Sequence, residues 1–421
     1  FYMPRKYDSL DQVPGHVLDK LGHYVTNIQG DTFVLHNLPH ELTGALMARY
    51  SRAPTGLKLT LVNEFLDDDG KPRADLGSQL MNRVLNDFND ESVGELEGVA
   101  VGIEDVSQIV TKSVEDRRLG GSPIEQSTRY VVFDKRDKDG KWRYLRPKEI
   151  DEAGQLGRFE RVTDAAFSVY SEGVKRLIEY FKVQSPRDQF KIEVEQQGSK
   201  VRLGENELTD PNQKQQFNLA YNFAIRCAAL DVGRCILPSS ALTHLGVQGN
   251  GRYYTGLLTA LKSGGLKEEH DRAISLEAEL NKAIPTFIQR NRVNPELESR
   301  PERMRALAKD LFTDIVPTDA RVTLAPRSDL FTEVLAASLY PYTNISLTQA
   351  TDKIQGLSPE EREHLFDVYV GDRKTRFDRS GRGLEAGYPI TFDLVGGFAE
   401  YRDLERHRML TQQRQKLSVE L

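Results

Sequence analysis

The pattern of hydrophobic and polar residues over the first 120 positions predicts alternating helices and strands. Apolar residues recur at helical spacing in three stretches, whereas the run from Leu57 to Leu61 alternates apolar and polar residues, which is typical of a half-buried strand. Val62 extends that run. The predicted helices are 41–50, 75–88 and 106–114, and the predicted strands are 57–62 and 99–103. The segment Gly120-Gly121-Ser122-Pro123 is expected to end the preceding helix, because glycine and proline interrupt regular backbone.

The middle of the chain reads as mainly helical. Helical spacing is clearest from Ala165 to Phe181, where six apolar residues fall on one face. The predicted elements are a strand at 129–133, a solvated turn at 134–142, helices at 165–181, 217–230, 253–261 and 274–288, and a linker at 290–300. The class that follows is α+β, with small sheets packed against long helices.

A second series of elements begins near Asp319. The expected elements are a new start at 319–324, helices at 331–339 and 360–370, a strand at 390–394 and a polar helix at 400–414. In the first series Glu97 precedes Arg117 by 20 positions (117 − 97), and in the second Glu385 precedes Arg406 by 21 (406 − 385). Such similar spacing suggests an internal repeat, although the pattern alone leaves the repeat open.

Composition limits the class of protein. The 421 residues are 38% hydrophobic and 29% charged, which indicates a globular protein of two to three domains. The net charge of −6 gives no overall attraction for nucleic acid, and no apolar run approaches the roughly 18 residues of a membrane helix. Cys227 and Cys235 are expected to be buried, unpaired thiols, which favours a cytoplasmic protein without a zinc site. Because the sequence opens at Phe1 without Met, we expect a piece of a longer chain.

Three places could carry chemistry. The segment from Ser122 to Tyr130 offers a carboxylate, hydroxyls and a guanidinium beside a Gly-Gly turn, and Arg406-His407-Arg408 offers two guanidiniums around an imidazole. Either could bind a phosphate, and the second could instead clamp a flavin ring. The alternative for both is a solvated surface segment. Arg234 lies in an apolar stretch near Asn250-Gly251-Arg252 and requires a partner. That partner is a ligand phosphate or an internal carboxylate. The glycine-rich run from Gly246 to Gly251 lacks the spacing of a dinucleotide-binding loop.

These three places together resemble the ThyX type of flavin-dependent thymidylate synthase, whose signature reads Arg-His-Arg-x-x-Ser-x-x-Glu-x-Ser-x-Arg. The resemblance covers residues 48–289 and, a second time, residues 321–421. The first copy matches the signature at Arg117, Ser122, Glu125, Ser127 and Arg129, but it has Arg118 and Leu119 in place of His and Arg. It also matches downstream at Arg234, Leu237-Pro238, Asn250 and Arg252, with Gly233 for an alanine and Leu261 for a later nucleotide-binding arginine.

The second copy shows the opposite pattern of matches. It matches fully at Arg406, His407 and Arg408, with Thr411 at the serine position, and then departs at Arg414, Lys416 and Ser418. The Glu-His pair of the family appears as Glu97-Gly98 in the first copy and as Glu385-Ala386 in the second. The resemblance therefore divides the chain into a first domain at 1–300, which retains the nucleotide side, and a second at 301–421, which retains the flavin side.

The resemblance implies methylation of dUMP to dTMP with methylene-tetrahydrofolate, NADPH and FAD, in which the cofactor supplies the chemistry and the protein positions the reactants. It places dUMP on Glu125, Ser127, Arg129 and Arg234, and FAD on Arg406, His407, Arg408, Asn250 and Arg252, without a metal. It further implies a homodimer that forms a pseudo-tetramer, in which the two half-signatures meet across an interface. The alternative is an inactive paralogue that binds nucleotide or acts as a scaffold.

Overall fold

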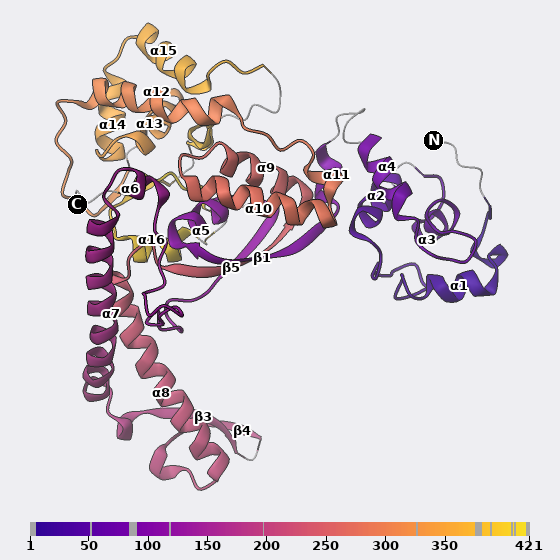
Figure 1. Cartoon of the computed structure of the whole chain (residues 1–421), viewed down its shortest axis with the longest axis horizontal. Helices are drawn as coiled ribbons and strands as arrows, with labels where there is room; N and C mark the ends of the chain where they lie inside the picture. Colours follow the sequence, from indigo (N-terminus) through magenta and orange to yellow (C-terminus); the bar gives the residue numbers. More distant parts are fainter. Residues whose placement is uncertain are drawn as a thin grey trace.

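The computed structural model describes residues 6–50, 53–83, 91–117, 119–196, 198–325, 327–374, 381–387, 390–405, 407 and 410–417. The fold is α+β, as the hydrophobic pattern predicts (Figure 1). The helices are α1 Gly15–Leu21, α2 His40–Tyr50, α3 Leu57–Thr60, α4 Ala74–Asn82, α5 Gln108–Glu115, α6 Lys148–Glu152, α7 Leu156–Gln184, α8 Pro211–Gly233, α9 Gly251–Lys262, α10 Lys267–Ala283, α11 Pro285–Ile288, α12 Pro295–Phe312, α13 Leu330–Leu339, α14 Leu347–Gln355, α15 Pro359–Val370 and α16 Phe398–Glu405. The strands are β1 Gly98–Ser107, β2 Gly121–Glu125, β3 Lys191–Gln196, β4 Ser199–Gly204, β5 Leu242–Asn250, β6 Val322–Leu324 and β7 Phe392–Leu394.

The central sheet has three antiparallel strands in the order β1-β5-β2. Gly98 of β1 pairs with Asn250 at one end of β5, and Glu125 of β2 pairs with Leu245 further along β5. Helices α9 and α10 lie along one face of this sheet (Figure 1). Side chains of that face join the largest core, whereas Ala100, Gly102, Ser122 and Gln248 are exposed on the other face. The sheet is therefore covered on one side and open on the other.

The N-terminal helices belong to the same core as the sheet. Leu42 and Leu46 of α2 and Met81 of α4 are fully buried in one cluster with Tyr254 of α9 and Ile288 of α11. The packing is close, because a Cβ at Gly44 of α2 would lie 2.6 Å from the ring of Phe287. Helix α2 therefore has a fixed position relative to the end of β5 and the start of α9.

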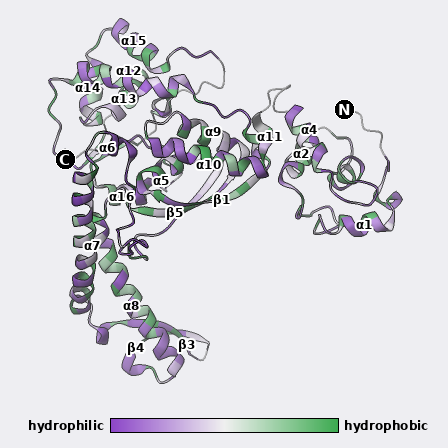
Figure 2. Ribbon diagram, viewed as in Figure 1, coloured by the Kyte–Doolittle hydropathy of each residue, from purple (hydrophilic) through white to green (hydrophobic). Residues whose placement is uncertain are grey.

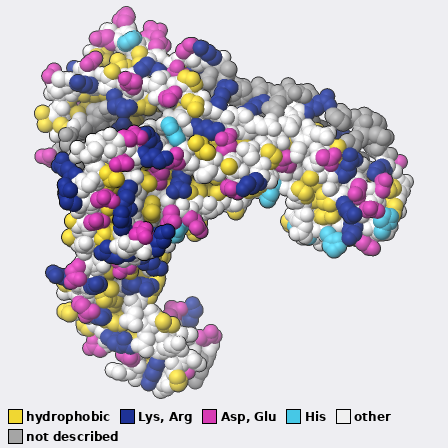
Figure 3. Space-filling view, viewed as in Figure 1, with side chains coloured by type: hydrophobic (Ala, Val, Ile, Leu, Met, Phe, Trp, Pro, Cys, Tyr) yellow, Lys and Arg dark blue, Asp and Glu magenta, His cyan; other side chains and the backbone are white. Residues whose placement is uncertain are grey.

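Helices α7 and α8 lie side by side and form an arm that ends in the β3–β4 hairpin (Figure 1). The base of the arm packs through Phe167, Tyr170 and Leu230 against Trp142 and Tyr144. Along its length, green hydrophobic segments alternate with purple hydrophilic ones (Figure 2). Several hydrophobic side chains remain at the surface of the arm (Figure 3). They include Val162, Val169, Tyr180 and Val183 of α7 and Leu219, Phe223 and Val232 of α8.

The C-terminal part has a second core, which contains Met304, Leu335, Leu339, Ile354 and Tyr369 from helices α12 to α15. The short ribbon β6–β7 lies beside it and is held by the Asp393 carboxylate, which accepts hydrogen bonds from Tyr340 and from the backbone of Leu347. Helix α12 spans position 300. The expected linker at 290–300 is therefore wrong from Pro295 onward, where Asn294 caps the helix and proline occupies its first turn.

Most predicted helices are confirmed, but two predicted strands are wrong. Leu57 to Val62 forms α3 and the start of a π-helical turn, Leu61–Phe65, because core side chains surround this segment and its buried positions no longer follow one face. Residues 129–133 are not a strand, since a turn at 128–130 is followed by a bend and irregular backbone. Strand β2 lies instead at Gly121–Glu125, which includes part of the segment expected to interrupt regular backbone. A Cβ at Gly121 would lie 2.4 Å from the Tyr253 ring, so the glycine allows close packing of strand on helix.

The predicted helix 400–414 ends at Glu405. Cys235 is exposed and Cys227 is partly buried, so the expectation of burial is wrong for Cys235; both thiols are free. Among the residues that the structure describes, none of the helices is long and apolar enough to cross a membrane, and no group of three or more metal-binding side chains is found.

Candidate functional site

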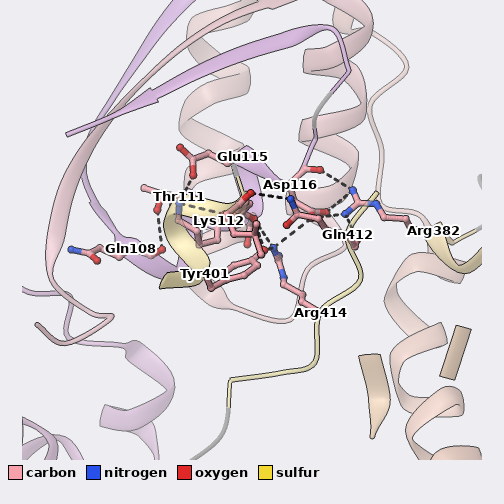
Figure 4. Close-up of polar contacts among 12 residues, drawn as sticks. Gln108, Thr111, Lys112, Glu115, Asp116, Arg382, Tyr401, Gln412 and Arg414 are labelled. Carbon is pink, nitrogen blue, oxygen red and sulfur yellow. Dashed lines mark hydrogen bonds and ion pairs between the residues drawn. The ribbon is translucent and has the colours of Figure 1, made fainter. Parts of the chain in front are cut away.

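A buried network of charged side chains connects α5 and β2 to α16. Figure 4 shows the part of it around Lys112 and Asp116. Lys112 of α5 is at its centre, with a side chain that is only 4% exposed. Its ammonium group pairs with Glu115 on the same helix, with Glu125 at 3.2 Å and with Glu405 of α16 at 3.3 Å. Lys112 therefore joins the first part of the chain to a helix that lies almost 300 residues later.

Arg402 of α16 makes the second connection. Its guanidinium donates to the Glu125 carboxylate and to the side-chain oxygen of Gln108, each at 2.5 Å, and approaches the Thr128 hydroxyl at 3.4 Å. The side chains of Arg402 and Glu125 are 8% and 3% exposed. Both charges have left water, so Arg402 depends on Glu125 for compensation, and Glu125 depends on Arg402 and Lys112.

The network continues toward the C-terminal residues that the structure describes. Asp116 pairs with Arg382 at 2.8 Å and with Arg414 at 3.4 Å, and Arg414 also pairs with Glu405 at 2.6 Å. Four cations (Lys112, Arg382, Arg402 and Arg414) face four carboxylates (Glu115, Asp116, Glu125 and Glu405). Burial raises the pKa of Glu115 in spite of the attraction of Lys112, and the neighbouring charges of Glu125 and Glu405 add to that rise.

A chain of ion pairs lies between α8 and α16. Arg129 binds Asp231 of α8 through two contacts, at 2.7 and 2.9 Å, and these hydrogen bonds and the carboxylate charge raise the pKa of Arg129. Arg234, at the end of α8, donates to Asp403 of α16 at 2.8 Å and lies 3.6 Å from Asp231. The partners of both arginines in this structure are thus internal carboxylates, one of the two alternatives for Arg234.

The structure brings Glu125, Arg129 and Arg234 into one region beside α16. Ser127 belongs to the same turn, where its hydroxyl accepts the backbone N–H of Arg129 at 3.2 Å. Glu125, however, is enclosed between Lys112 and Arg402. The two arginines expected to hold the nucleotide differ in exposure: the Arg129 side chain is accessible, whereas the Arg234 side chain is largely enclosed.

Asn250 and Arg252 lie at a second place, at the other end of the sheet. The register separates this end from Glu125 by four residues of β2, which corresponds to about 13 Å. Asn250 caps α9 by accepting the backbone N–H of Tyr253 at 2.8 Å, and Arg252 pairs with Glu95. Beside them is an open groove of about 360 Å³, lined by Glu95, Leu96, Glu97, Gly98, Gly120, Ser122, Gln248, Gly249 and Asn250.

Arg406, His407 and Arg408, here called the flavin half-signature, follow Glu405 of the network in the sequence. Arg406 and Arg408 lie outside the described residues, and His407, which is described, is exposed. Its backbone N–H donates to the carbonyl of Leu404 at 3.0 Å, which ties it to the end of α16. In the expected first copy, Arg117 donates to the carbonyl of Gly256 on α9 at 3.0 Å. The side chain at the first signature position of that copy is therefore directed into the fold.

Sequence reasoning missed the residues that hold this region together, namely Lys112, Asp231, Arg402, Asp403 and Glu405. Two signals were available. Lys112 stands among apolar residues of a predicted helix, where a charge requires a partner, and Arg402 and Glu405 lie three positions apart on one helical face. Neither signal identifies the partner, because the partners come from elements far apart in the chain.

The class of protein follows from a sequence match. A profile of the family described as "Thymidylate synthase complementing protein" matches residues 37–286, more than half of the chain, and the chain belongs to this family, the ThyX type. Among its relatives, the UPF0159 protein of Chlamydia muridarum (strain MoPn / Nigg) is 33% identical over 426 residues, which cover 96% of this chain and 75% of that protein. The UPF0159 protein Ta1429 of Thermoplasma acidophilum is 29% identical over 384 residues, which cover 89% and 74%.

Solved structures with some similarity include a UMP/dUMP methylase PolB from Streptomyces cacaoi bound with 5-Br dUMP, with a TM-score of 0.34, 17% identity, and coverage of 61% of this chain and 93% of that one. Another is the flavin-dependent thymidylate synthase ThyX from Helicobacter pylori complexed with FAD and dUMP, with a TM-score of 0.32, 16% identity, and coverage of 61% and 97%. Similarity at this level does not place a ligand on this chain. Family membership supports, in general terms, a methyltransferase of pyrimidine nucleotides.

Proposed function

We propose that this protein is a flavin-dependent methyltransferase that converts dUMP to dTMP with methylene-tetrahydrofolate and NADPH. The observation that carries the proposal is the docking of α16 on the first part of the chain. Arg402 and Glu405 bind Glu125 and Lys112, and Asp403 binds Arg234. Arg406 follows the last residue of α16 in the sequence, which supports the proposal that the flavin and nucleotide half-signatures lie close together within a single chain.

On the nucleotide side, Arg129 and Arg234 would hold the phosphate of dUMP with the help of Ser127. The Arg129 guanidinium makes a two-pronged contact with Asp231, and the same geometry suits phosphate oxygens; the Arg234 guanidinium approaches two separate carboxylates, Asp231 and Asp403. Glu125 receives a different role from the expected one: enclosed by Lys112 and Arg402, it would keep α16 in place instead of meeting the base or sugar. These residues bind and orient the substrate, and no protein nucleophile is required.

On the flavin side, Arg406, His407 and Arg408 would hold FAD together with Asn250, which lines the groove at the other end of the sheet, and Arg252, which pairs with Glu95 of that groove. The chemistry of the groove fits the polar edge of a flat ring, because it offers amide side chains, a hydroxyl and glycine backbone. When bound, the flavin would supply hydride and methylene transfer. NADPH and methylene-tetrahydrofolate complete the proposal as the sources of the hydride and of the carbon.

We also propose that the two parts of the chain are tandem copies and that two chains form a pseudo-tetramer. The proposal is supported by contacts between α5 and α16, which precede Arg117 and Arg406 in their respective copies. The exposed hydrophobic side chains of the arm provide a surface on which a second chain could pack. Sedimentation of the purified protein would test this proposal, and a monomer at all concentrations would contradict it.

Flavin uptake tests the proposed activity most directly. The purified full chain is expected to absorb as a flavoprotein, or to bind added FAD, and R406A should weaken that binding because it removes a guanidinium from the half-signature. R234A should weaken the binding of dUMP, measured by calorimetry, and leave FAD binding largely intact. R176A, which removes an exposed arginine of α7, serves as the matched control for both. A chain that takes up no FAD would contradict the proposal.

A second candidate is an inactive paralogue that binds nucleotide or acts as a scaffold. One specific observation favours it: Asp231 and Asp403 already occupy the arginines that a phosphate would need. A protein of this kind would bind dUMP weakly or not at all and would show no flavin absorbance. D403N separates the two candidates, because loss of the competing carboxylate should tighten dUMP binding if Arg234 belongs to a phosphate site.

A further inference from the structure

A histidine and a glutamate from distant parts of the chain meet at the groove near Asn250. His40, the first residue of α2, lies with Nδ1 2.9 Å from Oε1 of Glu97. The Glu97 side chain is 14% exposed and lines the groove, whereas that of His40 is 50% exposed. The imidazole therefore lies in reach of solvent, and the carboxylate that it contacts faces the groove.

The groove around this pair has a rigid floor. The backbone carbonyl of Glu97 accepts the N–H of Gly251 at 3.0 Å, and the carbonyl of Gly120 accepts the N–H of Asn250 at 2.9 Å. Helix α2 is fixed by the close approach of Phe287 to Gly44. Because its neighbours are tightly packed, the His40–Glu97 contact has a defined geometry instead of that of a mobile surface pair.

The backbone explains why the imidazole comes from α2. A Cβ at Gly98, the residue after Glu97, would lie 2.5 Å from the carbonyl oxygen of Gly249 on the paired strand. That approach is too close for any side chain, so position 98 cannot carry a histidine in this fold. His40 brings an imidazole to the Glu97 carboxylate from a separate helix. Arg252, the nearby cation, pairs with Glu95 instead.

We infer that His40 positions Glu97 to accept a hydrogen bond from a lactam N–H of a planar heterocycle bound in the groove. A carboxylate with one oxygen fixed by an imidazole presents its other oxygen in a defined direction. The side-chain amides of Asn250 and Gln248 can each donate to a carbonyl group next to such an N–H or accept from an amino group there. The inference rests on the proposed function, because uracil, flavin and folate rings all carry this group.

Calorimetric titration of the full chain with dUMP, FAD and tetrahydrofolate, each alone, tests the inference and identifies the ring. For one of the three ligands, H40A and E97Q should each raise the dissociation constant about tenfold, the cost of one lost polar contact. The double variant should be no weaker than either single variant, because both changes remove the same contact. H40Q should restore most of the affinity, since its amide can still donate to Glu97.

The controls separate a positioning role from loss of structure. H364A removes an exposed histidine on α15 and should leave all three affinities unchanged. Equal affinities of H40A and the natural chain for every ligand would overturn the inference and leave the proposed function intact, as would fully additive effects of H40A and E97Q. If the natural chain binds none of the three ligands, the proposed function fails and the inference fails with it.

Discussion

The Arg402–Glu125 pair allows a quantitative test of how α16 is held. R402A removes a guanidinium whose side chain is 8% exposed and leaves the Glu125 carboxylate, 3% exposed, inside the protein. Breaking a buried ion pair from one side costs about 3–5 kcal/mol, because the remaining charge is neither hydrated nor compensated. Lys112 still lies 3.2 Å from Glu125, so we expect the lower end of this range.

About 3 kcal/mol corresponds to a change of about two orders of magnitude in the equilibrium between docked and released α16. Hydrogen exchange of the backbone amides of residues 398–405 measures that equilibrium, because exchange requires local opening. The rate should rise about a hundredfold in R402A if α16 opens independently. R402K should be intermediate, since lysine keeps the charge but loses the planar fork.

The matched control is R176A on α7, where the arginine is 80% exposed and pairs with Glu172 one turn away. Such a surface pair contributes about 0.3–0.5 kcal/mol. If R402A accelerates exchange of α16 no more than R176A does, the buried network does not hold the helix, and the proposed meeting of the two half-signatures loses its support.

Three further predictions concern packing, protonation and thiol reactivity. G98A should lower the free energy of unfolding by about 1–3 kcal/mol, because its methyl group would collide with β5. G102A on the same strand has open space and should cost little. Equal urea midpoints for the two variants would contradict the packing argument. Burial raises the pKa of Glu115 above its ordinary value of 4.5, so the folded protein holds the carboxyl proton more tightly than the unfolded chain. The free energy of unfolding therefore falls as pH rises from 4.5 through the raised pKa. E115Q should remove this pH dependence, and parallel pH dependences of the two proteins would refute the assignment. Cys235 is exposed, whereas burial raises the pKa of Cys227, so a maleimide followed by mass spectrometry should modify Cys235 first, and the reverse order would show the assignment to be wrong.

Helices were predictable where one apolar face repeats over several turns. The expected helix 165–181 lies inside α7, and the expected helix 217–230 lies inside α8, because burial along one side is a local property of the sequence. The predictions failed where surroundings decide the conformation. Residues 57–62 are enclosed by the core. Gly121 lies in a strand that packs so closely on the Tyr253 ring that no larger residue fits there.

The candidate site divides in the same way. Residue types and spacing singled out Glu125, Arg129, Arg234 and the segment 406–408, since an arginine in an apolar stretch requires a partner wherever the chain folds. The partner itself was not predictable. Asp231 and Asp403 are ordinary acidic residues in the sequence, and they become partners only because α8 and α16 meet.

The sequence by itself determined the helices with regular periodicity, the α+β class and the family signature, since each depends on residues close together in the chain. Only the tertiary structure decided that α16 docks on α5, that Glu125 is enclosed by Lys112 and Arg402, and that His40 meets Glu97. Most of these contacts join residues that lie far apart in the chain, from 57 positions for His40–Glu97 to 277 for Glu125–Arg402. Their energies depend on burial and mutual distance, which a charged residue acquires only after distant elements have packed together.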